Sequence, residues 1–479
     1  MLRRLAPRVG TWFLWSLIAC RPSVPPDEAL AEPAAELRGW HYRADVAPGA
    51  NAIAVQLCFE GKPPRALVPV VREALRYVDD AKVVSTGRAL KVRGSRLSLE
   101  GVEPGECVAW RVDFDEVMHG EGDRTVTRIG DSMMVRQSMW LLWPVDAPDN
   151  LAPTIELRLP DGMQASVPWR ALEDGKRDGS RATFVLDDTV SRWLGYTVLG
   201  TLDVERYERA GAEIEIVRLD KHIACDRAGV RAWIDDAVDS VALLYDGYPR
   251  DRLQVIIVPV DGGGGTVYFG AAARGGGAAV YLLLDSEAKA ERLPGGWTTV
   301  HELLHHGMPF VEDAWMSEGF VSYYTELMRT RAGHRSEAEG WWELWEAFER
   351  GRTGGRGLSL RETSDRMHET HAYQNVYWGG AAIAFDIDVT MRRETNGERG
   401  FDDAVKHLRT CCGDAVRRVP AKKLLAELDT WYGKPIFTEI AERHLASEEF
   451  ADIAAIYRAL GITVGRSGVV LDDEHPAAA

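Results

Sequence analysis

The sequence predicts a multidomain α+β protein with an N-terminal β-sandwich, a middle α/β domain and a mainly helical C-terminal region. Two patterns predict this order. Short runs of alternating apolar and polar residues recur over 36–205, and helical spacing dominates from 297 onward. The chain has 479 residues, of which 46% are hydrophobic, enough for two or three domains with their own cores. We expect the middle domain over 206–332, the helical domain over 333–464 and a frayed tail over 465–479.

Short alternating segments support the sandwich. Ala52–Phe59 and Thr154–Leu159 alternate in this way, and turn residues such as Pro160-Asp161-Gly162 stand between the segments. Many short strands joined by such turns are typical of a sandwich. Cys58 and Cys107 lie in two of the expected strands, and the sequence is compatible both with a disulfide between them and with two buried free thiols.

The middle and C-terminal regions first mix helix and strand and then become helical. A helix is expected at 230–245, then a strand at Leu253–Val260, a glycine cluster at 262–265 and a strand at Ala279–Leu284. Later helices are expected at 297–306, 318–332, 338–350, 379–395, 401–411, 421–432 and 436–446. Cys411 and Cys412 are adjacent and lack Cys-x-x-Cys spacing, so we expect no metal there.

The charge of the chain excludes one class of partner. The formal net charge is −16, and dense basic stretches are confined to the extreme N-terminus. Nucleic-acid phosphates need patches of Lys and Arg, so we expect no nucleic-acid partner.

The N-terminus has the features of an export signal. Three arginines precede the apolar run Trp12–Ala19, which is too short to span a bilayer as a helix. The run ends in Leu17-Ile18-Ala19-Cys20, which resembles the bacterial lipobox, so 1–20 is predicted to be a lipoprotein signal peptide and Cys20 a lipid anchor. An ordinary signal peptide with a chance cysteine is the alternative. Residues 21–35 are expected to form a linker.

The residue after Cys20 suggests where the anchor lies. Arg21 stands there, rather than the aspartate associated with retention in the inner membrane. We therefore expect a protein of the bacterial cell envelope, an outer-membrane lipoprotein that faces the periplasm or the cell surface.

Two histidines four residues apart carry the main chemical signal. On a helix His301 and His305 share one face and can bind one zinc ion, and Glu302 beside them is placed to take a proton from a metal-bound water. His306 points off that face and is not expected to be a ligand. The alternative is a surface helix with two solvated histidines. The flanking residues are apolar, as a buried helix requires: Val300, Leu303 and Leu304.

A third ligand is expected on the next helix. A catalytic zinc ion takes three protein ligands and keeps one open position. Gly307 and Pro309 end the first helix, so the chain can turn back and present Glu318 to the metal. Ser317 is the expected N-cap of the second helix.

With this motif in place, the sequence resembles the gluzincin metallopeptidases, and among them the glycyl aminopeptidase family. The aminopeptidase N family is a more distant relative. The similarity extends from about 297 to 460, and its motifs are specific in combination. Four segments carry it: His301–His305, Ser317–Tyr324, Val376–Ala381 and Asp386–Gly397.

The resemblance implies a thermolysin-like catalytic domain over 206–332 and a role for each residue of its site. His301, His305 and Glu318 would bind zinc, Glu302 would be the general base and Tyr377 would donate a hydrogen bond to the tetrahedral oxyanion. Zinc lowers the pKa of its water to about 7 and polarises the scissile carbonyl. A donor aimed at a developing oxyanion is worth about 10²–10³ in rate.

The sequence departs from its relatives in two places. Only twelve residues separate His305 from Glu318, which is fewer than in the relatives and requires a tighter connection. Aminopeptidases also carry a glutamate that holds the substrate α-amine before the zinc helix, and the segment 262–285 contains none. Arg274 stands where that glutamate is expected, which disfavours amine recognition. The glycines there would allow a peptide to add as a strand, or they mark a flexible loop.

These features together predict an exported zinc metallopeptidase that acts on a peptide or protein substrate. Cleavage at chain ends and cleavage at interior bonds both remain open, as does the oligomeric state. A zinc hydrolase of a non-peptide substrate and a non-catalytic peptide-binding protein on the same fold are the alternatives. His368 and His371 are expected to be solvated surface residues.

Overall fold

A computed structural model describes residues 37–472 and 474–475, apart from gaps within that range. The gaps are 123–124, 149–150, 173–179, 188–189, 191–194, 220, 263–266, 356 and 415–416. The expected signal peptide at 1–20, with Cys20, and the expected linker at 21–35 lie outside the described residues. Among the helices that are described, none is both long and apolar enough to cross a membrane.

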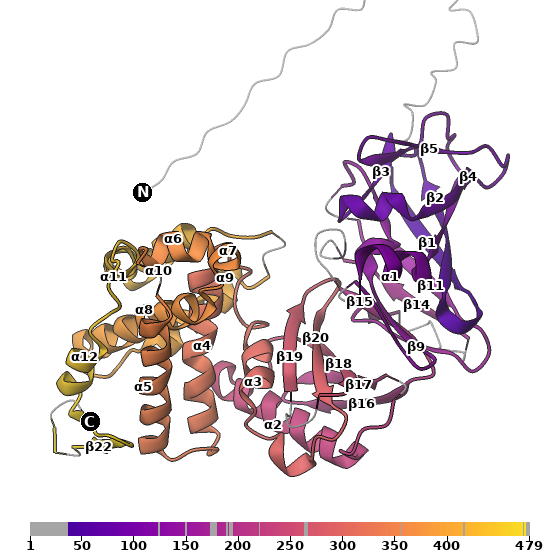
Figure 1. The fold of residues 1–479 in the computed structure, drawn as a ribbon. Helices are drawn as coiled ribbons and strands as arrows, with labels where there is room; N and C mark the ends of the chain where they lie inside the picture. Colours follow the sequence, from indigo (N-terminus) through magenta and orange to yellow (C-terminus); the bar gives the residue numbers. More distant parts are fainter. Residues whose placement is uncertain are drawn as a thin grey trace, which may run out of the picture.

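The N-terminal region is built from β-sheets, as the alternating pattern predicted (Figure 1). Its described strands pair in three sheets, in the orders β13-β14-β11-β1-β2-β7-β4, β10-β3-β6-β5 and β12-β15-β9-β8. One apolar core is shared by all three sheets and includes Trp40 of β1, Leu67 of β3 and Met133 of β9. The strands are β1 (Gly39–Val46), β2 (Ala52–Glu60), β3 (Ala66–Pro69), β4 (Val78–Val83), β5 (Lys91–Arg93), β6 (Arg96–Ser98), β7 (Cys107–Asp113), β8 (Val126–Ile129), β9 (Ser132–Arg136), β10 (Leu142–Pro144), β11 (Thr154–Arg158), β12 (Gln164–Ser166), β13 (Arg170–Ala171), β14 (Arg181–Val185) and β15 (Tyr196–Gly200).

The two cysteines of this region are paired. Cys58 of β2 lies directly opposite Cys107 of β7 in the antiparallel register, and the two form a disulfide. The structure thus decides between the two states that the sequence left open. Helix α1 (Phe114–Glu121) follows β7 directly, and the Asp113 side chain caps it by accepting from the N–H groups of Asp115 and Glu116.

A further, five-stranded sheet lies between the N-terminal region and the helices (Figure 1). Its described strands follow the order β16-β17-β18-β20-β19, and β19 at the edge runs antiparallel to β20. One face packs against α2 and α3, and the other packs against strands of the N-terminal region through residues such as Tyr196 and Tyr281. The elements are β16 (Asp203–Arg209), β17 (Ala212–Arg218), α2 (Arg227–Tyr245), β18 (Arg252–Val260), β19 (Val267–Ala273), β20 (Ala278–Asp285) and α3 (Trp297–Leu304).

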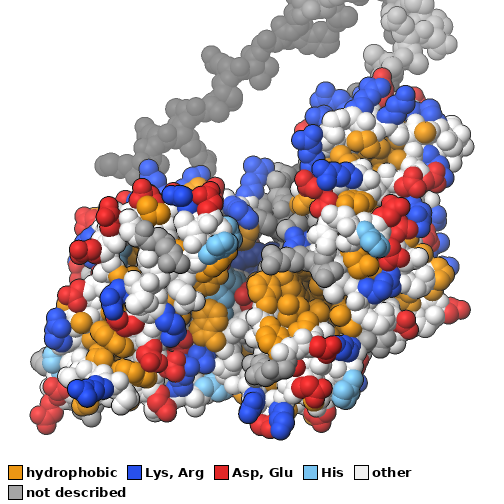
Figure 2. Space-filling view, viewed as in Figure 1, with side chains coloured by type: hydrophobic (Ala, Val, Ile, Leu, Met, Phe, Trp, Pro, Cys, Tyr) orange, Lys and Arg blue, Asp and Glu red, His pale blue; other side chains and the backbone are white. Residues whose placement is uncertain are grey.

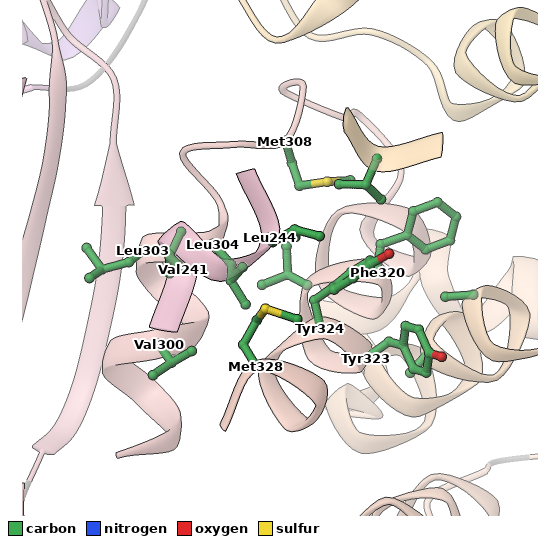
Figure 3. Packing of buried hydrophobic residues seen from close by; sticks show 14 of the residues in the cluster. Val241, Leu244, Val300, Leu303, Leu304, Met308, Phe320, Tyr323, Tyr324 and Met328 are labelled. Carbon is green, nitrogen blue, oxygen red and sulfur yellow. The ribbon is translucent and has the colours of Figure 1, made fainter. Parts of the chain in front are cut away.

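From α4 onward the described chain is mainly helical. Figure 3 shows how the first of these helices joins the sheet: Leu303 of α3 points towards the strands, while Leu304 lies near Leu244 of α2 and the side chains of α4. The mixed α+β class predicted from the sequence is confirmed. The remaining elements are α4 (Ala314–Arg331), α5 (Glu337–Thr353), α6 (Leu360–Asp365), α7 (Met367–Thr370), α8 (Tyr373–Glu394), α9 (Phe401–Cys412), α10 (Ala421–Tyr432), α11 (Ile436–Leu445), α12 (Ile453–Ala459), β21 (Ile462–Val464) and β22 (Val469–Leu471).

Helices α4 and α8 approach closely because glycines face each other at their crossing. A Cβ at Gly380 would lie 1.8 Å from the carbonyl oxygen of Trp315, and a Cβ at Gly319 would lie 2.4 Å from the Gly380 Cα. Both contacts are far too short for a side chain, so only glycine permits this packing. Gly379 and Gly380 therefore lie inside α8, and the prediction that this helix begins at 379 is wrong by six residues.

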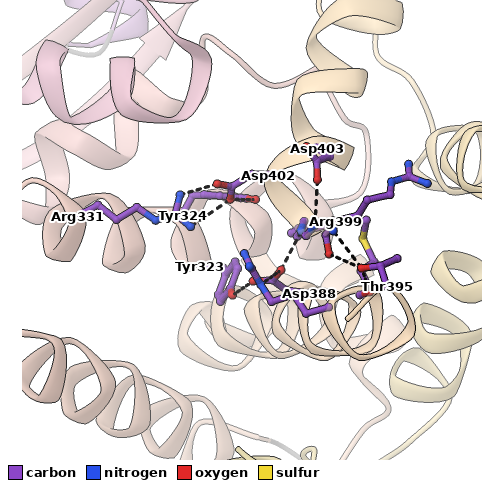
Figure 4. Close-up of polar contacts among 12 residues, drawn as sticks. Tyr323, Tyr324, Arg331, Asp388, Thr395, Arg399, Asp402 and Asp403 are labelled. Atoms are coloured by element: carbon purple, nitrogen blue, oxygen red, sulfur yellow. Dashed lines mark hydrogen bonds and ion pairs between the residues drawn. The ribbon is translucent and has the colours of Figure 1, made fainter. Parts of the chain in front are cut away.

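Buried polar contacts fix α4 further along its length (Figure 4). The Tyr323 hydroxyl donates to Oδ2 of Asp388 on α8 at 2.7 Å, and the other oxygen of Asp388 accepts from the backbone N–H of Phe401 at 2.8 Å. The Tyr324 hydroxyl donates to Asp402 at 3.0 Å. A buried hydrogen bond adds little net stability, but a buried polar group without a partner costs much more. These partners therefore fix the position of α4 relative to α8 and α9.

Two further expectations are wrong in detail. Helix α4 begins at Ala314, with Asp313 as its N-cap in extended conformation, so Ser317 lies inside the helix and does not cap it. The segment expected to be a frayed tail contains β22, which pairs with β21. The other expected helices occur within a few residues of their predicted bounds.

Candidate metal centre

Three predicted ligands meet at one point between α3 and α4. His301 lies within α3, His305 is its C-cap residue in helical conformation, and Glu318 lies in the second turn of α4. The His301 Nε2 is 3.2 Å from the Glu318 Oε2 and 3.3 Å from the His305 Nε2, and the third distance, from His305 Nε2 to Glu318 Oε2, is 3.4 Å. The three atoms form a nearly equilateral triangle.

This triangle has the size that a zinc ion requires. Tetrahedral ligands about 2.0–2.2 Å from zinc lie about 3.3–3.6 Å from one another. The donor set of two histidines and one glutamate is the set found in one class of catalytic zinc sites.

Residues around His301 hold its ring in place. The ring stacks on Trp297, with centroids 4.2 Å apart, and its Nδ1 lies 3.4 Å from the Thr325 hydroxyl. That hydroxyl in turn donates to the carbonyl oxygen of Val321. A partner on the outer nitrogen orients a metal-binding imidazole, so Thr325 fits the role of an outer-shell residue. Sequence reasoning missed both residues, although Trp297 precedes His301 by one helical turn and Thr325 follows Glu318 by two.

The pKa values of Glu318 and His305 in the cluster depend on each other. Burial raises the pKa of the Glu318 carboxyl, but the charge of His305 and the hydrogen bonds from both histidines outweigh it and hold this pKa well below its usual range. Burial lowers the pKa of His305, but the Glu318 carboxylate outweighs it and raises the value. The Glu318 carboxylate therefore favours a positive charge beside it, which a proton on His305 or a bound cation would supply.

Glu302 lies one residue after His301 and reaches the edge strand. Its Oε2 accepts a hydrogen bond from the backbone N–H of Ala272 in β19 at 2.9 Å. A Cβ at Gly270 would lie 2.7 Å from the Glu302 Cγ, so glycine leaves the space that the carboxylate needs. The N–H of Ala272 points away from β20, so Glu302 is held at the open edge of the sheet.

Tyr377 of α8 closes the cluster on another side. Its ring is parallel to that of His301, with centroids 5.9 Å apart and an interplanar angle of 7°. Burial, followed by the charges of Glu318 and Glu302, raises the pKa of Tyr377 far above its usual value. The phenol therefore stays protonated at neutral pH and can donate a hydrogen bond.

Arg274 does not point into a substrate site but fastens the turn after the zinc-motif helix. Its guanidinium donates to the carbonyl oxygens of His305 and Met308, the latter at 2.8 Å. Burial, followed by the charge of Arg250, lowers the pKa of Arg274 to about 9. Arg250 donates to the His306 carbonyl oxygen at 2.8 Å, so two arginines secure the short connection between His305 and Glu318.

The other histidines near the motif serve different purposes. The ring nitrogens of His306 are engaged by the Tyr248 hydroxyl at 2.7 Å and the Ala279 carbonyl at 3.0 Å, away from the cluster. Burial, then the charges of Arg274 and Arg250, holds the pKa of His306 well below its usual value. His368 and His371 are exposed, as expected.

Exposed apolar surface lies beside the site. Figure 2 shows hydrophobic side chains gathered over the part of the molecule where β19 and β20 lie. Tyr268 and Phe269 of β19 are among the large hydrophobic residues that are exposed, and Phe269 contacts Tyr281 of β20 with ring centroids 5.9 Å apart. The open edge of β19 thus offers both backbone groups and apolar contacts.

Comparisons with known proteins identify the fold. No family model matches the sequence, and no curated protein matches it either. An aminopeptidase N family protein from Idiomarina loihiensis superposes with a TM-score of 0.69 at 16% identity, over 89% of this chain and 79% of that one. An M1 zinc metallopeptidase from Deinococcus radiodurans gives 0.55 at 15% identity, over 87% and 95%. A variant from the same organism, bound to a Tyr-Ser-Ala substrate, gives 0.53 at 14% identity, over 87% and 94%.

The chain thus has the fold of the M1 zinc metallopeptidases. The resemblance to the aminopeptidase N family that the motifs predicted is confirmed at the level of this fold.

Proposed function

We propose that the protein is a zinc metallopeptidase in which His301, His305 and Glu318 bind the metal. The observation that carries the proposal is the triangle of their ligand atoms, with sides of 3.2–3.4 Å, next to Glu302. The names of the proteins that share the fold support it, since they are M1 zinc metallopeptidases and one was bound to a tripeptide substrate.

The residues around the triangle supply the rest of the reaction. Zinc, when bound, polarises the scissile carbonyl and acidifies a water. Glu302 takes a proton from the attacking water and passes it to the leaving amine, and the Ala272 N–H holds its carboxylate at the strand edge. The protonated Tyr377 hydroxyl donates to the developing oxyanion.

The substrate binds as an added strand along β19, and its free N-terminus is not required. The edge of β19 is open to pairing, and Arg274 is committed to backbone carbonyls at the position where relatives carry an amine-binding glutamate. The partly buried cation at this position also repels an ammonium group. Cleavage of interior bonds is therefore the favoured mode.

Glu302→Gln tests the reaction. We expect zinc content to stay at one per chain while hydrolysis of a fluorogenic peptide library falls by about 10²–10⁴, the usual contribution of a general base. Glu312→Gln, an exposed carboxylate after the same turn, is the matched control and should keep full activity. Full activity in Glu302→Gln would rule out the proposal. Comparing free and acetylated N-termini decides the mode of cleavage, and a strong preference for free amines would rule out the interior mode.

Lipid anchoring through Cys20 in the bacterial outer membrane is part of the proposal. It is supported by the lipobox-like sequence before Cys20 and by the Cys58–Cys107 disulfide, since disulfides persist in exported proteins. Labelling with a radioactive fatty acid should mark the wild type and leave Cys20→Ser unlabelled. Equal labelling of both proteins would contradict it.

A further inference from the structure

A second group of metal-binding side chains lies on another pair of helices. His407 and Cys411 stand one turn apart on α9, and Glu427 comes from α10, with one ligand atom of each lying within 4.8 Å of the others. The His407 Nε2 is 2.8 Å from the Glu427 Oε1. Cys411 is bonded to its neighbour Cys412 in a disulfide.

The packing of these helices fixes the ligands. One side of α9 is buried through Phe401, Val405 and Leu408. This packing fixes the orientation of the helix that bears His407 and Cys411. The ring of His407 stacks on Trp431 of α10, with centroids 5.1 Å apart and an interplanar angle of 20°. The group is thus held by core packing and by a stacked aromatic ring.

The ligand types suit a borderline-soft divalent cation. A thiolate, an imidazole and a carboxylate are all zinc ligands, and three protein ligands leave a position for water. The sulfur of a disulfide is not a thiolate, so the oxidised protein lacks the ligand that selects such a metal.

We propose that reduction of the Cys411–Cys412 disulfide opens a second metal site, in which Cys411, His407 and Glu427 bind a zinc ion. A dithiol reductant supplies two electrons and two protons: the Cys411–Cys412 bond breaks, each sulfur gains a proton, and the reductant becomes a disulfide. Metal binding then releases the proton of the Cys411 thiol to solvent.

Cobalt spectroscopy of Cys412→Ser tests the site without any reductant, since this variant leaves Cys411 as a free thiol. A thiolate bound to Co²⁺ gives a near-ultraviolet charge-transfer band, and the cluster at His301 has no sulfur and cannot give one. We expect the band in Cys412→Ser at once, and in the wild type only after reduction with a dithiol and its removal by gel filtration. Absence of the band from folded Cys412→Ser would overturn the proposal.

Matched variants assign the ligands. Cys411→Ser should show no band, and a band of equal strength there would overturn the proposal by assigning the sulfur to Cys412. Adding Cys225→Ser, the buried free cysteine, to Cys412→Ser should leave the band unchanged.

In the Cys412→Ser background, His407→Ala and Glu427→Gln should each weaken Co²⁺ binding about tenfold or more, since outer-shell losses alone cost 10–100-fold. Unchanged affinity in both, with circular dichroism showing a folded protein, would overturn it. These readouts do not depend on hydrolysis.

Discussion

Two pairs of helices in this protein each bring three candidate metal ligands together, but in different surroundings. In both α3–α4 and α9–α10, two side chains one turn apart on the first helix converge with a glutamate from the second. The exposed side-chain fractions differ: 2% for His301 and 22% for Glu318, against 23% for His407 and 43% for Glu427. Each pair thus brings three ligand atoms within 4.8 Å of one another, although the side chains differ in exposure.

What separates the two regions is what surrounds the ligands. The α3–α4 cluster lies beside an open strand edge and has Glu302 and Tyr377 next to it, and buried partners orient its rings. Within the described part of the chain, the α9–α10 group has a stacked ring from Trp431, and its three side chains come from helices alone. The residues next to the α3–α4 cluster, rather than its three ligands alone, therefore make it suited to peptide hydrolysis.

The largest expected effect comes from removing the glutamate of each pair. Glu318→Ala should abolish stoichiometric zinc binding and measurable hydrolysis, since loss of a ligand exceeds the 10–100-fold that outer-shell losses cost. Glu427→Ala removes the corresponding residue of α9–α10 and should leave hydrolysis within about twofold. Zinc content by mass spectrometry and peptide hydrolysis measure both. Equal losses of activity in the two variants would break the distinction between the regions.

Tyr377→Phe should show that the surroundings, rather than the metal ligands, supply part of the catalysis. Loss of one donor to a developing oxyanion lowers kcat by about 10²–10³, or roughly 3–4 kcal/mol, while KM and zinc content change little. Tyr373→Phe, an exposed residue one turn earlier on α8, is the control and should keep kcat. A drop in zinc content that matches the drop in kcat would mean that Tyr377 acts on the metal site itself.

The contrast also explains what could be predicted from the sequence. The spacing of His301 and His305 is local, and Glu318 follows after a short connection, so the sequence could predict that these residues meet. The α9–α10 group could not be found in the same way, because Glu427 lies beyond a turn whose geometry no motif specifies. Cys58 and Cys107 remained undecided for a similar reason, since only the register of β2 and β7 places them opposite each other.

The errors in helix bounds have tertiary causes. Gly379 and Gly380 are read as a helix start, but they lie inside α8. Glycine is needed there because a Cβ at Gly380 would meet the Trp315 carbonyl oxygen and a Cβ at Gly379 would meet the Leu360 side chain. Helices α6 and α7 have six and four residues, too few for a periodic pattern to indicate them. The partners of Arg274 are likewise more than thirty residues away along the chain, so its role in fastening a turn was not predictable.

Arg274→Met should destabilise the turn between α3 and α4 and leave the α9–α10 group unchanged. The change leaves the buried carbonyl oxygens of His305 and Met308 without their donor, which costs about 2–4 kcal/mol of unfolding free energy. Because His305 is a predicted ligand, zinc affinity should fall as well. Arg409→Met removes the donor to the Pro249 carbonyl and is the control, expected to lose stability but not zinc affinity. Urea unfolding and zinc competition with a chelator give the two readings, and equal zinc affinity in both variants would refute a specific role for Arg274.

The smallest expected effect is the pH dependence of the metal-free protein. The raised pKa of His305 means that its stabilisation is fully present below about 6.5, its unfolded value, and is lost as the pH rises through the folded value. The lowered pKa of Glu318 means that its stabilisation is present above about 4.3 and is lost as the pH falls through its folded value. The pair therefore stabilises the metal-free protein most between these two unfolded values.

The metal-free protein should lose stability as the pH rises above about 6.5, whereas bound zinc should stabilise the protein more as the pH rises. The reason is that the metal competes with the proton of His305 and therefore binds more tightly at higher pH. Urea unfolding of chelator-treated and zinc-loaded protein between pH 5 and 8 measures both trends, and Glu318→Gln, which removes the carboxylate that raises the His305 pKa, is the control. We expect the stability difference between the metal-free wild type and metal-free Glu318→Gln to shrink as the pH rises, while the increment from zinc in the wild type grows. A constant difference between the two metal-free proteins would show that the histidine proton and the carboxylate are not coupled, and that the metal does not replace a proton in this cluster.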